Sequence, residues 1–205
     1  MYILPLITHA IPMKKKNFSH STNNPRKSRF LQIMFHCIFL FFLASFLGFL
    51  WEVVIFLIKE HTFYNRGFLY GPWLPIYGVG AVLFFLLLRK IEHRPLLVFL
   101  LSGLIGSVLE YTIGWLLDHF FHLRYWDYSD YFCNWNGYIC FWSVAGFCVA
   151  GVLWVCIISH FALYFYEKMP APWQRRLLSL LILTFLMDCA ASLIIPNQGN
   201  GITFR

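Results

Sequence analysis

Five long apolar runs constrain this chain more than any other feature of its sequence. An α-helix needs about 20 consecutive apolar residues to cross the hydrocarbon core of a membrane. Charged residues make up 12% of the chain, about half the share that is typical of soluble domains. We therefore predict an all-α fold, a polytopic transmembrane helical bundle with about five spans. The predicted spans are residues 30–58, 72–88, 95–117, 137–166 and 177–195.

The positions of the basic residues predict an orientation for these spans. Twelve of the 16 Lys and Arg residues precede the first span, separate the second from the third, or separate the fourth from the fifth. Cytoplasmic loops carry such an excess, so we predict a multi-pass protein of the cell membrane with a cytoplasmic N-terminus. The expected regions are a disordered basic tail (1–29), an integral membrane domain (30–196) and a short outer tail (197–205). The N-terminal apolar run precedes the basic cluster, unlike a signal peptide, so Met13 is an alternative start.

The composition also bears on partners and cofactors. The basic residues do not form one face outside the loops next to the membrane, so we do not expect the protein to bind nucleic acid. We do expect it to contact membrane lipids, including those with anionic headgroups. The six cysteines form no C-x-x-C motif. His119 and His122 have a spacing that can share a metal ion, but no wider ligand pattern accompanies them. We therefore predict neither a metal nor a cofactor.

An internal repeat relates the first two spans to the next two. At an offset of 58 residues, Gly48 matches Gly106 and Glu52 matches Glu110, and an acid–His pair and an arginine follow in both copies. The match resumes at an offset of 70, so the second copy holds about twelve extra residues, including "WDYSDYFCNWN". A repeated two-span unit of one orientation predicts a pseudo-two-fold axis along the membrane normal.

The repeated glutamates are the first candidates for a functional site. A carboxylate within a span is costly unless it faces a cavity or a partner, and the predicted axis would bring Glu52 and Glu110 together. Two like carboxylates cannot both ionise easily at close range, which suits proton handling or cation binding. In the alternative, structural interpretation, each glutamate holds the arginine fourteen residues later, Arg66 or Arg124. Asp188 is a weaker candidate, because a lone acid can simply accept hydrogen bonds from a neighbouring hydroxyl or backbone.

The stretch "RGFLYGPWLPIYG" at residues 66–78 interrupts the apolar pattern where the second span should begin. Pro72 suits the first turn of a helix, and Pro75 is expected to hold a bend. A helix that begins below the membrane surface is tolerated only against protein or a water-filled cavity, so we predict a re-entrant entry beside Glu52. The alternative is an interfacial turn with Trp73 and Tyr77 as anchors. The predicted gate or structural residues are Gly67, Gly71, Pro72, Pro75, Gly78 and Gly137.

The insertion in the second copy is both aromatic and polar. Its Trp and Tyr side chains could be interface anchors, or Asp127 could cap a pocket over the glutamates. The predicted substrate-binding residues are Glu52, Glu110, Arg66, Tyr77, Trp126, Asp127 and Asn136.

Two motifs resemble a known family. "NRGFLYGPWLPIYGVGA" (65–81) and "LEYTIGWLLDHFFHLRYWDYSDYFCNWNGYIC" (109–140) are similar to those of the CmpB-like "putative ABC-transporter type IV" membrane proteins, over about residues 47–153. The resemblance implies a permease-like protein. The chain contains no G-x-x-x-x-G-K-[ST] motif, so any ATPase would be a separate chain.

The leading hypothesis is a transporter-like or permease-like protein with an outward-facing cavity lined by acidic and aromatic residues. Its candidate partners, besides lipids, are a separate ATPase subunit and a second copy of the chain. One alternative is an intramembrane enzyme that acts on a lipid or prenyl substrate, with the same carboxylates as acid and base. Another is a non-catalytic subunit that binds another membrane protein through small-residue faces.

Overall fold

The computed structural model describes residues 25–61, 63, 65, 67–195, 197 and 203–204 of the 205. It confirms the all-α class. Besides the helices, the described residues form one antiparallel pair of two-residue strands, which joins the second loop to the C-terminal tail. The elements in chain order are α1 (Pro25–Glu60), α2 (Pro75–Leu88), η2 (Arg89–Ile91), α3 (Pro95–Phe121), β1 (Leu123–Arg124), α4 (Phe141–Leu153), η3 (Trp154–Ile158), α5 (Ser159–Lys168), α6 (Ala171–Ile194) and β2 (Thr203–Phe204).

In the described part of the chain, four helical segments are long and apolar enough to cross a membrane, so the chain is a membrane protein. They are Arg29–Glu60, Pro95–Phe121, Phe141–Lys168 and Ala171–Ile194. The predicted second span differs, because α2 has only 14 residues. At 1.5 Å per residue it is about 21 Å long, short of the ~30 Å hydrocarbon core.

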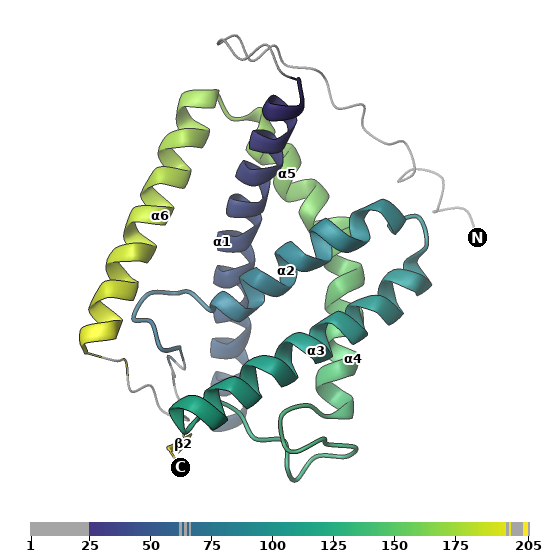
Figure 1. Cartoon of the computed structure of the whole chain (residues 1–205), viewed down its shortest axis with the longest axis vertical. Coiled ribbons are helices and arrows are strands. Elements are labelled where there is room, and N and C mark those ends of the chain that lie inside the picture. The colour runs from purple at the N-terminus through teal and green to yellow at the C-terminus, as the bar shows by residue number, and fades with distance from the viewer. Residues whose placement is uncertain are drawn as a thin grey trace.

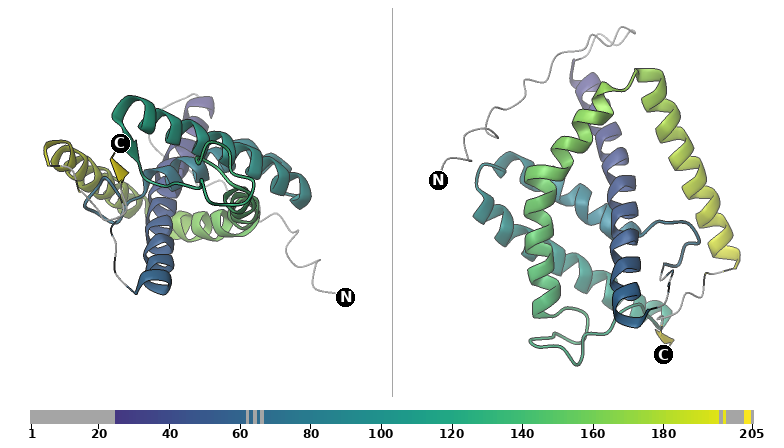
Figure 2. Two further views of the ribbon diagram at one scale, coloured as in Figure 1. Left: turned by 90° about the horizontal axis from the view of Figure 1, so that it is seen from below. Right: turned by 180° about the vertical axis from the view of Figure 1, so that it is seen from behind.

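The helices run between two ends of the bundle (Figure 1). We call the end that holds the last turn of α1 and residues 122–140 the loop end. α1 runs to the loop end, α2 leads back, α3 returns, and the continuous α4–η3–α5 segment leads back again. α6 then descends on the opposite side of α1 from α4 and α5 (Figure 2).

The second helix begins beside the middle of α1. Leu74 precedes the helix, and its backbone N–H donates to the Ser45 carbonyl over 3.2 Å. The helix starts at Pro75, not at Pro72 as predicted. Pro75 takes the first helical position because its missing N–H has no partner to lose there. Residues 67–74 therefore lead from the loop end into the bundle before α2 starts.

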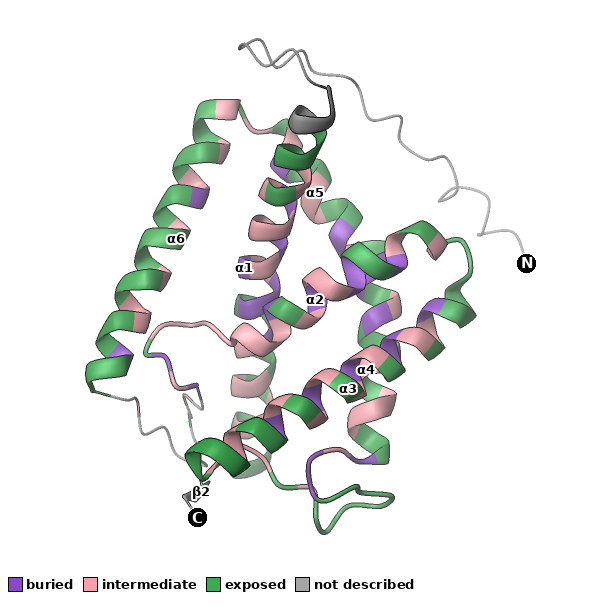
Figure 3. Ribbon diagram, in the orientation of Figure 1, coloured by how far each residue is buried: buried purple, intermediate pink, exposed green. Residues whose placement is uncertain are grey.

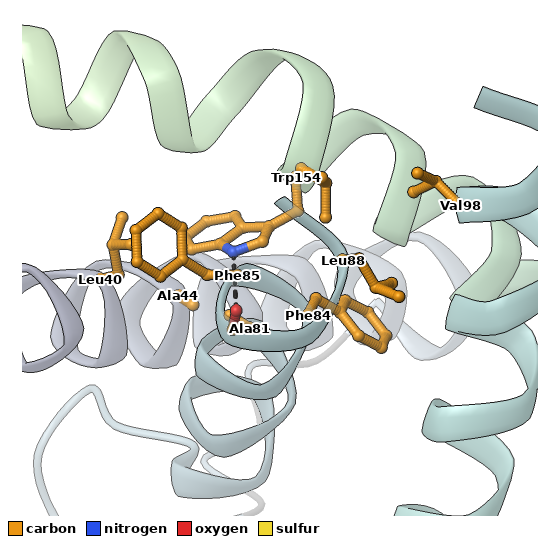
Figure 4. Packing of buried hydrophobic residues seen from close by; sticks show 9 residues of the cluster. Leu40, Ala44, Ala81, Phe84, Phe85, Leu88, Val98 and Trp154 are labelled. Carbon is orange, nitrogen blue, oxygen red and sulfur yellow. Dashed lines mark hydrogen bonds between the residues drawn. The ribbon is translucent and has the colours of Figure 1, made fainter. Parts of the chain in front are cut away.

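The short α2 supplies much of the hydrophobic core. Its buried side chains pack against α1, α3 and η3, and burial along the bundle concentrates at this crossing (Figure 3). The indole N–H of Trp154 donates to the Ala81 carbonyl over 2.9 Å (Figure 4). The buried cluster consists of Leu40, Ala44, Ala81, Phe84, Phe85, Leu88, Val98, Trp154 and Val155.

Helix packing follows the repeat that the sequence predicts. A Cβ atom on Gly48 would overlap the ring of Tyr77, and one on Gly106 would overlap the ring of Phe147. Tyr77 and Phe147 are 70 residues apart, which is the second offset of the repeat. Each glycine thus lets an aromatic residue of the next helix approach the backbone closely. The α1–α2 and α3–α4 pairs are therefore packed at equivalent positions.

Candidate functional site

The first repeated glutamate accepts a hydrogen bond from α2. The Tyr77 hydroxyl donates to Glu52 Oε1 over 2.6 Å. Tyr77 is the third residue of α2, and its ring lies against Gly48, one helical turn before Glu52 on α1. The late start of α2 and the absence of a side chain at Gly48 together place this hydroxyl on the carboxyl group.

The second glutamate is more deeply buried and has a different partner. Glu110 on α3 is 7% exposed and accepts a hydrogen bond from the Tyr128 hydroxyl over 3.2 Å. Its other oxygen, Oε2, is buried and has no hydrogen-bond partner of normal geometry in the described part of the chain, although the Ser143 side chain at the start of α4 is close enough to interact with the carboxyl group. Buried polar atoms almost always have such a partner, so this oxygen marks an unusual position.

The two pairs form one cluster. Glu52 lies close enough to Glu110 to act on it electrostatically, and Tyr77 and Tyr128 are each within electrostatic reach of both carboxyl groups. We call Glu52, Tyr77, Glu110 and Tyr128 the tyrosine–glutamate cluster. Burial and the neighbouring Glu110 charge raise the pKa of Tyr128, so its hydroxyl keeps its proton and can donate. The sequence singled out Glu52, Glu110 and Tyr77, but it treated Tyr128 only as an interface anchor.

Arg124, which follows Glu110 by fourteen residues in the second copy, does not contact Glu110. Arg124 is 7% exposed and binds Asp118 over 3.1 Å and Asp127 over 2.7 Å. A third contact, at 3.2 Å, goes to the Asn136 carbonyl. The structural interpretation in which Glu110 holds this arginine is therefore wrong for the second copy. Arg66, the predicted counterpart in the first copy, lies outside the described residues.

The other predicted residues of the insertion stabilise its own loop. Trp126 donates its indole N–H to the Tyr138 carbonyl over 2.9 Å, and Asp127 accepts from the Ser129 backbone over 2.9 Å. Burial acts to raise the pKa of Asp127, but hydrogen bonds from Ser129 and Arg124 outweigh it, and the pKa lies below its ordinary value.

A tight turn completes this loop. Asn136 and Gly137 both have positive φ, at 53° and 71°. A turn of this kind favours Asn-Gly, and it lets the Tyr138 N–H donate to the Trp135 carbonyl over 3.1 Å. Trp126, Asp127, Asn136 and Gly137 thus shape the loop from which Tyr128 reaches Glu110.

Two of the predicted gate glycines lie at close backbone contacts. A Cβ atom on Gly78 would meet Phe41 of α1 at 2.6 Å, and one on Gly71 would meet the Asp188 carboxylate at 2.8 Å. At Gly67 the nearest atom would be 3.3 Å away. Gly71 and Pro72 lie in the segment that leads to α2, and Pro75 begins that helix.

Two hollows lie elsewhere on the molecule. An apolar crevice of about 400 Å³ separates α6 from α1 and α2. A polar pocket of about 260 Å³ at the loop end is bordered by Asp118, His119 and His122, with two aromatic residues. Neither hollow is lined by a residue of the tyrosine–glutamate cluster. The cluster is therefore set apart from both.

The fold and the cluster define a polytopic helical membrane protein built on a repeated helix pair, with paired carboxyl groups inside the bundle. The chain belongs to the family described as "Putative ABC-transporter type IV", which matches residues 39–193. This match confirms the resemblance found in the two motifs and extends it through most of α6. No curated protein and no solved structure shows a significant match.

Proposed function

We propose that this protein is a permease that moves a small solute, or a proton, past the tyrosine–glutamate cluster. One observation carries the proposal: two repeat-related glutamates lie within electrostatic reach of each other in the bundle, and Glu110 has a buried oxygen without a hydrogen-bond partner of normal geometry among the described residues. Acidic residues inside membrane helices mark solute or ion pathways when they face the bundle interior. The family description supports transport as the general class.

Each member of the cluster has a proposed role. Glu52 and Glu110 bind the solute or the proton. The Tyr77 and Tyr128 hydroxyls hold the carboxyl groups in place between binding events, since each donates a hydrogen bond to one of them. Access requires an acidic and aromatic cavity that opens toward the loop end, and residues 67–74 are the gate that opens it.

Orientation and partners follow from the charge pattern and the family. The excess of basic residues supports a cytoplasmic N-terminus in a protein of the cell membrane, and in this orientation the loop end faces outward. An ATPase, where one takes part, is a separate chain, because the nucleotide-binding motif is missing from the sequence. Association with membrane lipids or with a second copy is also part of this proposal.

The test replaces the carboxyl groups while keeping their size. Glu52→Gln and Glu110→Gln should each impair complementation of a deletion strain, measured by untargeted comparison of metabolites and lipids. The double variant should be little worse than either single variant, because residues that act as one unit are not additive. Glu92→Gln is the matched control, since Glu92 pairs with His160 away from the cluster.

The readouts separate the possible results. Normal complementation by both single variants would rule out the cluster as the site. Function that simply follows protein amount, with additive losses of stability, would assign the glutamates a structural role. A changed lipid profile without a transport defect would point to an intramembrane enzyme instead.

The orientation has its own test. In a cysteine-free background, Glu92→Cys should be shielded from impermeant thiol reagents in intact cells, and Asp130→Cys should be labelled. Glu92 lies between α2 and α3, and Asp130 lies in the loop before α4. Labelling of the first position alone would reverse the proposed orientation.

A further inference from the structure

The last helix lies outside the repeat, and its polar contacts raise the question of what it does. α6 stands at the side of the bundle (Figures 1 and 2), and its buried residues are only Leu178 and Ser192. The apolar crevice separates much of it from α1 and α2. Near the loop end, however, α6 and the residue after it bind the segment at residues 67–74 closely.

Asp188 makes the central contact. Its Oδ1 accepts the Tyr70 backbone N–H over 3.0 Å, and its Oδ2 accepts the Gly71 N–H over 2.8 Å. The Ser192 hydroxyl, one turn later on α6, also lies 3.3 Å from Oδ1. A side chain at position 71 would collide with this carboxylate, so Gly71 is what permits both bonds.

Further bonds hold the same segment at the end of α6. The Tyr70 hydroxyl donates to the Ile195 carbonyl over 3.0 Å. The Asn197 side chain donates to the Gly67 carbonyl over 2.9 Å and to the Leu69 carbonyl over 3.2 Å. Irregular backbone inside a membrane must be satisfied by protein or water, and α6 with its C-terminal extension provides those partners here.

The held segment leads directly to the tyrosine–glutamate cluster. It ends at Leu74, which is bonded to Ser45 of α1, and Tyr77 follows three residues later. Trp73 adds edge-to-face contacts with Phe42 of α1 and Phe185 of α6. The segment is thus fixed between α1 and α6 immediately before the tyrosine that donates to Glu52.

We propose that Asp188 is a positioning residue: by binding the backbone of Tyr70 and Gly71, it holds the segment that places Tyr77 on Glu52. The proposal rests on the function proposed above and assigns α6 the control of the predicted gate. Release of Asp188 from the segment would free the start of α2 and break the Tyr77–Glu52 hydrogen bond, which uncovers one carboxyl group of the cluster.

Hydrogen exchange of the purified full-length protein in detergent tests the structural step. Asp188→Ala should accelerate exchange at least about tenfold in residues 67–74 and also in residues 75–81, because the proposal makes both depend on the hydrogen bonds to the Asp188 side chain. Asp188→Asn keeps one acceptor oxygen and should be intermediate. Thr184→Ala is the control, since the Thr184 hydroxyl bonds back to carbonyls of its own helix. Wild-type exchange at 75–81 in Asp188→Ala would overturn the proposal.

A double substitution tests whether Asp188 acts through Tyr77. Asp188→Ala and Tyr77→Phe should each impair complementation of the deletion strain, and the combined variant should be no worse than the more severe of the two. Additive defects would overturn the positioning role. If exchange changes as expected while Glu52→Gln, Glu110→Gln and Tyr77→Phe all complement normally, the contact to α6 stands and the proposed function fails.

Discussion

The two loops that join the helices of each repeated pair are stabilised in different ways. Residues 122–140 are held mainly by their own contacts: Arg124 binds Asp127 and the Asn136 carbonyl within the loop and Asp118 near the end of α3, and the Tyr128 N–H donates to the Gly137 carbonyl over 2.8 Å. The loop of the first pair is shorter. Its segment at residues 67–74 donates backbone N–H groups to Asp188 of α6 and accepts a hydrogen bond from the Asn197 side chain.

The difference shows two solutions to one problem. Both loops must satisfy irregular backbone next to apolar helices. The second copy does so with about twelve inserted residues, and the first copy does so with a helix that follows the repeat. In both, a carboxylate beside a glycine is central: Asp127 lies near Gly137, and Asp188 lies near Gly71. The insertion also supplies Tyr128, so the second glutamate receives its donor from the loop and not from the next helix.

The largest effect is expected from breaking the internal network of the second loop. Arg124→Ala would leave Asp118 and Asp127 without their shared cation, and loss of one partner of a buried ion pair costs about 3–5 kcal/mol in the free energy of unfolding. Asp188→Ala should cost less, because it leaves two N–H groups and no buried charge. Thermal and denaturant unfolding in detergent measures both.

A surface arginine provides the control for this substitution. Arg176 is exposed and lies over the Trp173 ring at 5.4 Å, so Arg176→Ala should cost under about 1 kcal/mol. Equal losses for the two arginine variants would show that the second loop does not depend on its internal ion pairs.

Two glycines at matching positions of the repeat sharpen the comparison. Gly137 has a φ of 71°, and an added Cβ would lie 2.5 Å from the Asp127 carboxylate. Gly137→Ala should therefore cost about 1–3 kcal/mol in the free energy of unfolding. Gly67→Ala meets its nearest atom at 3.3 Å and should change stability by about 0.5 kcal/mol or less. If Gly67→Ala proves the more costly, the two loops do not differ as described.

Sequence reasoning found the features that repeat and missed those that occur once. The apolar runs predicted the all-α bundle, and the matched Gly and Glu residues predicted that α1–α2 and α3–α4 would pack alike. The structural interpretation, one of the two that the sequence left open, paired Arg124 with Glu110 because the repeat emphasises that spacing, whereas Arg124 binds Asp127, three residues after it in the chain. Tyr128 belongs to the insertion, so no repeat position identified it.

Contacts between distant segments explain the remaining differences. Asp188 and Gly71 are 117 residues apart, and no local pattern links a lone acid on one helix to the backbone of an irregular segment. The start of α2 could not be read from composition either, because Pro72 and Pro75 both suit a first helical turn. Which of the two prolines begins the helix depends on a contact with α1, the hydrogen bond from the Leu74 N–H to the Ser45 carbonyl.

The two tyrosines allow a smaller and more specific test. Tyr77→Phe and Tyr128→Phe each remove one hydrogen bond, which costs about 1 kcal/mol. Tyr128→Phe should cost more than Tyr77→Phe, because it removes the hydroxyl donor of the buried Glu110, whereas Glu52 is only partly buried. Unfolding in detergent measures both losses of stability. A larger loss for Tyr77→Phe would show that Glu52 depends more on its hydrogen-bond donor than Glu110 does.

The smallest effects are expected at the helix starts that follow the two loops. α4 begins with a hydrogen-bonded cap, in which the Cys140 N–H donates to the Ser143 hydroxyl over 3.1 Å, so Ser143→Ala should cost about 1 kcal/mol.

α2 begins with Pro75, and Pro75→Ala restores an N–H that has no helical partner at the first position. We expect a loss of about 0.5 kcal/mol, mainly through a more flexible unfolded chain. Pro95→Ala at the start of α3 is the control, since Pro95 occupies the same helical position outside both loops. If Pro75→Ala costs clearly more than both Pro95→Ala and Ser143→Ala, then Pro75 does more than begin a helix, and the first loop depends on its bend as well as on α6.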